Sequence, residues 1–148
     1  YEALKQLVQF LKPGGQIVLT FPSLGTFDSL WNRIGHEMQL RGLAKEQKAL
    51  AEYIKERPSA NQAKEWLKEL GMEKVAVFER PLEIQSGPSR EFLEHPLLRG
   101  GFLEDAYECF DDQALANEFM TAISNDLPSF IPLTAQRCAM AGWKPKAI

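Results

Sequence analysis

The stretch that decides the fold is Phe10–Phe21, which reads FLKPGGQIVLTF. Pro13 cannot continue a helix, and Gly14 and Gly15 permit the positive φ that a tight turn needs. The run that follows, Gln16–Phe21, is short, almost continuously apolar and contains β-branched side chains. Such a run between turn signals predicts a strand buried on both faces, as in a parallel sheet.

Helical patterns surround this strand. Apolar residues recur at helical spacing over residues 2–11, and again over 26–41 and, more weakly, 43–56. A Ser-x-x-Gln capping box begins the next helix at Ser59, and Gly71 stands where a left-handed C-cap belongs. We therefore expect one helix before the strand and three after it.

The second half of the chain repeats this alternation. Val75–Phe78 predicts another buried strand, residues 88–95 a short helix, and Asp112 the cap of a clearer helix. Residues 96–110 are ambiguous, and Thr134–Trp143 predicts a final strand. Strands separated by helices predict an α/β fold with a mostly parallel sheet.

Three strands make a thin sheet. A strand that is buried on both faces requires neighbours on both sides. Part of the sheet is therefore expected to lie outside this chain, or to come from a second copy of it. The chain begins at Tyr1, which suggests a fragment, and we expect a single domain over residues 1–148.

Composition narrows the function classes. The 148 residues are 45% hydrophobic and 25% charged, which is ordinary for a soluble globular domain. A net charge of -3 without basic runs argues against nucleic acid, and no apolar run reaches the roughly 20 residues of a membrane helix. No signal peptide is visible, so the cytoplasm is the default location. Cys109 and Cys138 are expected to be reduced thiols, and neither histidine has partners at metal-ligand spacing.

The opening stretch resembles the Leu-Lys-Pro-Gly-Gly turn of class I S-adenosylmethionine-dependent methyltransferases, where it leads into the fifth strand. Trp66–Met72 is similar to that family's last major helix and its glycine stop, and Val75–Phe78 to the sixth strand. Thr134–Pro145 resembles the closing strand, which in the family is antiparallel and lies between the fifth and sixth.

The resemblance implies a partial Rossmann-like methyltransferase sheet of about three strands with several covering helices. It makes the chain the C-terminal half of that fold, with helical insertions at about 26–56 and 88–127. Ser23–Trp31 and Pro132–Thr134 also faintly resemble malonyl-carrier-protein O-methyltransferases.

The cofactor loop of the family is glycine-rich, follows the first strand, and precedes an acidic residue that binds the ribose. Gly14–Gly15 precedes a strand instead, and Gly100–Gly101 has no strand-loop-helix context. The resemblance therefore implies S-adenosylmethionine in the parent protein, and none is expected to bind this chain alone. No residue is assigned to catalysis, cofactor binding or metal binding.

Substrate-binding candidates follow from topology. Ligands of open α/β sheets bind beyond the carboxyl ends of the strands, which points to Thr20, Phe21, Pro22 and Ser23. His36 lies on the next helix, which would cover that edge as part of a lid. The alternatives are that Phe21-Pro22 merely turns the chain and that His36 is a surface histidine.

Two functions remain open. The chain is a methyltransferase fragment that supplies the sheet edge and the cover over a small or carrier-bound substrate, and that is inactive alone. Alternatively, it is a non-catalytic module that binds itself or a partner, because an unpaired apolar sheet edge recruits another strand. The expected partners are the missing N-terminal half or a second copy, in a homo-oligomer.

Overall fold

The structure is a computed structural model that describes residues 1–85, 93–125 and 133–146. The chain forms two compact units. The sheet unit contains residues 1–26, 57–82 and 136–148, and the helical unit contains residues 27–56 and 83–135.

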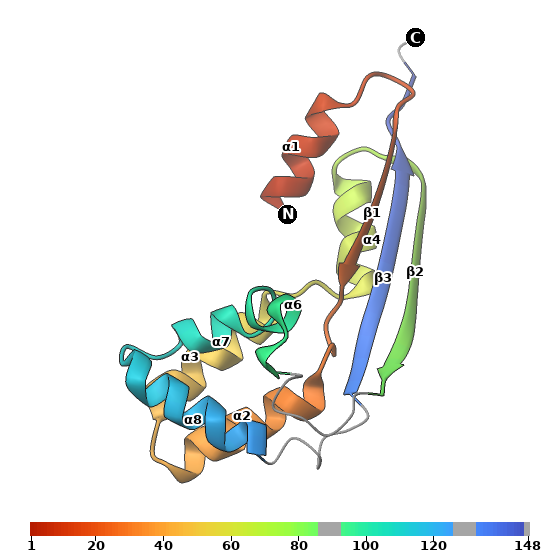
Figure 1. The fold of residues 1–148 in the computed structure, drawn as a ribbon. Helices are drawn as coiled ribbons and strands as arrows, with labels where there is room; N and C mark the ends of the chain where they lie inside the picture. The colour runs from red at the N-terminus through yellow and green to blue at the C-terminus, as the bar shows by residue number, and fades with distance from the viewer. Residues whose placement is uncertain (86–92, 126–132, 147–148) are drawn as a thin grey trace. The chain divides into compact units, whose positions relative to one another are not determined.

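Three strands form one sheet: β1 (Gln16–Pro22), β2 (Glu73–Ile84) and β3 (Leu133–Trp143). Their order is β1-β3-β2, so the last strand of the chain lies between the other two. β3 runs antiparallel to β1, and in Figure 1 the arrows of β1 and β2 point the same way, opposite to β3. The α/β fold class is confirmed, and the strand order is the one that the resemblance implies.

Two expectations about this sheet are wrong. Its neighbouring strands are antiparallel, because the returning β3 separates the two strands that share a direction. β1 is also not buried on both faces. Ile17 is 8% exposed but Val18 is 60% exposed, so burial alternates along the strand as in a sheet covered on one face.

Two helices, α1 (Glu2–Phe10) and α4 (Ala60–Glu69), cover the inner face of the sheet. Their buried side chains pack with side chains from the sheet and from the residue before β2; this core contains Leu4, Val8, Ile17, Ala63, Leu67, Met72 and Met140. The expected capping box is confirmed, because Ser59 accepts from the Gln62 N–H and Gln62 accepts from the Ser59 N–H. Gly71 has a φ of 72°, the left-handed C-cap expected there.

The Pro-Gly-Gly turn is held by the far end of the chain. The Gly14 N–H donates to the carbonyls of Lys144 and Pro145, and the Lys144 N–H donates to the Gly15 carbonyl at 2.8 Å. Gly14 has a φ of 77°, which explains the glycine at that position. The turn that leads into β1 is thus fastened to the residues that leave β3.

Lys144 also caps α1. Its Nζ donates to the carbonyls of Val8 at 3.1 Å and Leu11 at 2.9 Å, at the negative end of the helix dipole. We expect Lys144→Met to lower the free energy of unfolding by about 1 kcal/mol, because charged hydrogen bonds to exposed helix ends are lost. Urea denaturation measures this. Lys146→Met is the control, and an equal loss in both variants would refute the capping role.

Five helices of the helical unit lie wholly within the described residues: α2 (Asp28–Leu40), α3 (Ala44–Lys55), α6 (Pro96–Arg99), α7 (Glu104–Glu108) and α8 (Gln113–Asn125). The expected helices over 26–41 and 43–56 are confirmed, as is the cap at Asp112, whose carboxylate accepts from the Ala114 N–H at 2.8 Å. The ambiguous stretch 96–110 contains α6 and α7. The helix expected over 88–95 falls largely outside the described residues.

The helical unit has its own core. Its most deeply buried large side chains come from α2, α3, α8 and the connections between them; they include Leu30, Trp31, Ile34, Met38, Leu50, Leu103, Phe119 and Ile123. The Trp31 ring meets the Tyr53 ring edge-on at 5.9 Å. The two units therefore each bury a separate apolar cluster.

Candidate functional site

The candidate site lies at the carboxyl end of β1. Ser23 is completely buried, and its N–H donates to the Gln136 carbonyl at 2.9 Å. Its hydroxyl donates to the carboxylate of Glu79 on β2. Ser23 thereby joins the end of β1 to β2, the strand on the other side of β3.

Thr26 fixes the loop that follows. Its hydroxyl accepts from the Gln136 N–H at 3.0 Å and donates to the Gln136 carbonyl at 3.2 Å. Arg57, which lies shortly before α4, donates to the Thr26 carbonyl at 3.0 Å. This hydrogen bond connects the loop after β1 to the segment that leads into α4. We call this group the Ser23 cluster; it consists of Ser23, Thr26, Arg57, Glu79 and Gln136.

The Ser23 cluster contains one exposed carboxylate, that of Glu79, next to two buried hydroxyl residues. Glu79 is exposed, whereas Ser23 and Thr26 are 0% and 1% exposed. A carboxylate accepts hydrogen bonds and can hold a hydroxyl or ammonium group of a ligand. The arrangement is suited to binding and orienting a polar group at the sheet edge.

Cys138 on β3 is buried beside this cluster. Burial raises the pKa of its thiol, and the negative charge of Glu79 raises the pKa further. A raised pKa leaves the thiol protonated near neutral pH, where it is a poor nucleophile. Cys138 is therefore a core residue, in keeping with the reduced thiol expected from the sequence.

Glu79→Gln tests this electrostatic link. Removal of the negative charge is expected to lower the pKa of Cys138, while burial keeps it above the ordinary range of a thiol. The measurement is a titration of thiolate absorbance in a Cys109→Ser background, with Glu73→Gln as the control. An unchanged titration midpoint in the Glu79 variant would show that this carboxylate does not act on the thiol.

The sequence-predicted residues do not all share one surface. Phe21 packs on the inner core and Ser23 is buried below the sheet end, whereas Thr20 and Pro22 are exposed on the outer face. This separation follows from the two-residue period of a strand. Ser23 is the candidate that belongs to the polar cluster; substrate binding by any of the four stays a prediction.

His36 belongs to the helical unit. It is exposed on α2 and lines a shallow cavity of about 310 Å³ between α2 and α3, with Asn32, Gln39 and Gln47. The Gln47 side chain donates to the Gly35 carbonyl at 3.1 Å in the same place. Apolar side chains, Trp31, Leu50 and Ile54 among them, line the cavity together with these polar groups. A lid role for His36 stays a prediction.

Glu79 was missed by motif reasoning. It comes directly after the apolar run Val75–Phe78, so it reads as the end of a strand. Glu79 nevertheless lies two residues beyond Val77, so the two-residue period of a strand places both side chains on the same inner face. This period is the sequence feature from which Glu79 could have been predicted. The partners Thr26, Arg57 and Gln136 carry no local signal, since they meet only in the folded chain.

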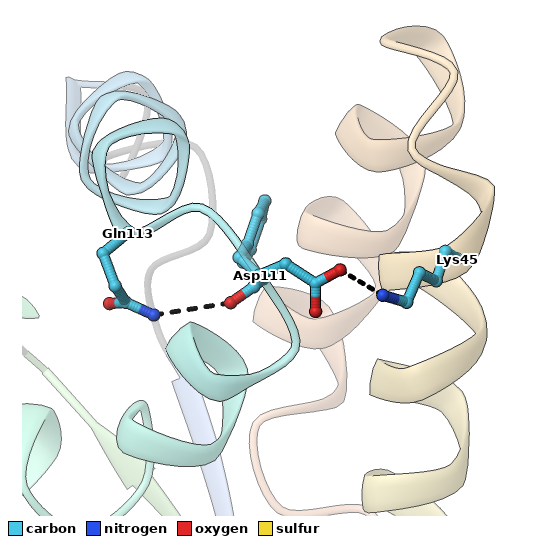
Figure 2. A network of polar contacts seen from close by, with 4 residues as sticks. Lys45, Asp111 and Gln113 are labelled. Atoms are coloured by element: carbon cyan, nitrogen blue, oxygen red, sulfur yellow. Dashed lines mark hydrogen bonds and ion pairs between the residues drawn. The ribbon is translucent and has the colours of Figure 1, made fainter.

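A second polar network lies in the helical unit (Figure 2). Lys45 on α3 forms an ion pair with Asp111, and the Gln113 side chain donates to the Phe110 carbonyl at 3.4 Å. The hydrogen bond to Asp111 raises the pKa of Lys45. The pair links α3 to the segment just before α8. Because both charged side chains are exposed, the pair forms no enclosed site.

The glycine pairs do not form a cofactor loop in the structure. The Gly14 N–H donates to the Lys144 and Pro145 carbonyls, the Gly15 N–H to the Lys12 carbonyl, and the Gly100 N–H to the Pro96 carbonyl. These donors are therefore not directed at a ligand in the way that a strand-loop-helix turn directs them. Within residues 1–85, 93–125 and 133–146, no three His, Cys, Asp or Glu side chains gather as metal ligands, and no helix there could cross a membrane.

No family model matches the sequence, and the search of curated proteins finds no match. Among solved structures, the chain is similar to Haemonchus contortus phospholethanolamine N-methyltransferase 2 in complex with phosphomonomethylethanolamine and S-adenosylhomocysteine. The TM-score is 0.41 at 15% identity, and the match covers 96% of this chain and 29% of that chain. The chain thus spans less than a third of that protein, and a likeness this distant decides neither fold nor activity.

Proposed function

We propose that this chain is the C-terminal part of an S-adenosylmethionine-dependent methyltransferase and supplies its sheet edge and substrate cover. The observation that supports this most is the strand order β1-β3-β2, with an antiparallel β3 in the middle. That order accompanies the Pro13–Gly15 turn at the start of β1, as the resemblance implies for the end of the fold. Motif and topology are independent features, and they agree.

The proposed partner is the missing N-terminal half or a second copy of the chain. β1 is an edge strand among the described strands, so one row of its backbone N–H and C=O groups faces away from β3. Free strand edges recruit further strands. In the proposed enzyme, the N-terminal half adds its strands to this edge and carries the S-adenosylmethionine site.

The Ser23 cluster gives this half a role in substrate binding. Methyl transfer depends mainly on alignment of the acceptor with the methyl group, so positioning is the main requirement. The carboxylate of Glu79, fixed by the buried Ser23 hydroxyl, would hold a polar group of a small or carrier-bound acceptor. Binding of S-adenosylmethionine is assigned to the N-terminal half. We therefore propose that this chain is inactive alone.

Calorimetric titration of S-adenosylmethionine into the 148-residue chain tests this division of labour. We expect no measurable heat of binding, because the glycine turns of the chain are closed on their own backbone. S-adenosylhomocysteine serves as a second ligand, and an intact methyltransferase serves as the positive control. Tight binding of either ligand would show that the cofactor site lies within this chain.

A non-catalytic binding module is the second candidate function. The observation that favours it is the exposure of large apolar side chains in the sheet unit, where Phe10 is 87%, Phe78 69% and Val18 60% exposed. Both candidates expect self-association through the open edge. Sedimentation should show a dimer or larger species, and a stable monomer at high concentration would count against an exposed pairing edge.

A further inference from the structure

The helical unit contains another cavity, which the proposed function does not use. Residues of α6, α7 and α8 line it, and its volume is about 190 Å³. A water molecule in the liquid occupies about 30 Å³, so the cavity has room for about six waters. Pockets for drug-sized ligands are larger than this. The cavity is therefore of a size that suits a small metabolite.

One side of α8 forms a wall of this cavity. Asn117, Met120, Thr121 and Ser124 all line it, and they are spaced three or four residues apart, so they lie along the same side of the helix. Asn117 and Thr121 are exposed, whereas Met120 and Ser124 are buried. The cavity thus has a polar rim and a buried base.

Ser124 is the residue that points to an occupant. It is 6% exposed, and its hydroxyl oxygen is buried with no hydrogen-bond partner among the described residues. A buried hydroxyl without a partner costs free energy, and such groups are rare in folded proteins. A molecule inside the cavity would supply the missing partner, because a serine hydroxyl can both donate and accept.

Two side chains of opposite charge line the same cavity, Arg99 and Glu94. The Arg99 guanidinium lies over the Tyr107 ring, 5.5 Å from its centroid. This contact uses the flat face of the guanidinium and leaves its in-plane N–H groups for an anion. The Glu94 carboxylate accepts hydrogen bonds, and the buried Leu93 and Met120 add apolar surface.

We propose that this cavity binds a free amino acid with an apolar side chain. Arg99 and the Ser124 hydroxyl would bind its carboxylate, and Glu94 would bind its ammonium group. The side chain of the amino acid would pack on Leu93 and Met120. A purely anionic ligand would meet Glu94 and a purely cationic one Arg99, whereas a zwitterion pairs with both. The inference goes beyond the proposed methyltransferase role and does not depend on it.

The test is a titration of the full chain with L-leucine, followed by saturation-transfer difference NMR. We expect saturable binding. Isocaproate lacks the ammonium group and isoamylamine lacks the carboxylate, so each should bind about tenfold more weakly. Arg99→Met and Glu94→Gln should each weaken L-leucine binding by about tenfold. The control is Lys48→Met, which removes one positive charge from an exposed position on α3 outside the cavity and should leave binding unchanged.

Ser124→Ala separates binding from folding. The substitution removes a buried hydroxyl that has no partner, so the urea midpoint of the chain without ligand should rise. The same variant should bind L-leucine more weakly, because it has lost a hydrogen bond to the carboxylate. A residue with only a structural role would not show these opposite effects.

Three results would overturn the proposal. The first is equal binding of L-leucine, isocaproate and isoamylamine, and the second is undiminished L-leucine binding in the Arg99 or Ser124 variant. The third is the absence of saturable L-leucine binding while Ser124→Ala still raises the urea midpoint, which would mean that the cavity holds only water.

Discussion

Replacement of Phe119 by alanine is expected to lower the free energy of unfolding by about 3 to 5 kcal/mol. The side chain is fully buried on α8 at the centre of the helical unit. Its ring lies 5.4 Å from the Phe110 ring, and the Arg41 guanidinium lies 5.2 Å from its centroid. The variant loses the buried apolar surface and both ring contacts, and leaves a cavity.

Chemical denaturation followed by circular dichroism measures this loss. Leu40→Ala is the matched control, because Leu40 is 67% exposed on α2 and its removal opens no cavity. We expect the control to stay within about 0.5 kcal/mol of the wild type. A Phe119 variant as stable as the control would mean that the helical unit has no core at this position.

Gly15→Ala is expected to destabilise the sheet unit by about 1 to 3 kcal/mol. A Cβ atom on Gly15 would lie 2.8 Å from the backbone carbonyl oxygen of Lys12, too close for a normal contact. The turn that fastens β1 to the end of β3 would have to shift, and the hydrogen bond between Lys144 and Gly15 would shift with it. Thermal and urea denaturation report the change.

Gly35→Ala provides the opposite expectation. A Cβ atom on Gly35 meets nothing within 4 Å, and the residue lies inside α2. Alanine there should raise stability by about 0.5 to 1 kcal/mol, because glycine costs conformational entropy in a helix. If Gly15→Ala stabilises the protein as Gly35→Ala does, the Gly15 Cβ does not clash with the Lys12 carbonyl, and the turn is not packed as closely as described.

The helices and turns were predictable because their signals are local. The Ser59 capping box, the Gly71 C-cap and the Asp112 cap each depend on residues a few positions apart, and each is confirmed. β1 was placed to within a residue of its observed end at Pro22. The strand order followed from the family resemblance, since no spacing rule places a last strand between two earlier ones.

The burial of the strands and the polar cluster were not predictable in this way. An apolar run looks the same whether one or both faces are covered, so the exposure of Val18 could not be read from composition. β2 continues through Arg80 and Pro81 to Ile84, because an edge strand with an open face accepts polar residues and proline. The bond between Ser23 and Glu79 joins residues 56 positions apart, and only the folded sheet brings them together.

The central claim is that this chain is the C-terminal part of a methyltransferase, and the coding sequence upstream of Tyr1 tests it most directly. The account predicts that sequencing this region will reveal a strand, a glycine-rich turn that opens a helix, and an acidic residue further along. An upstream region without a strand and glycine-rich turn would contradict the account and leave the binding module as the function of the chain.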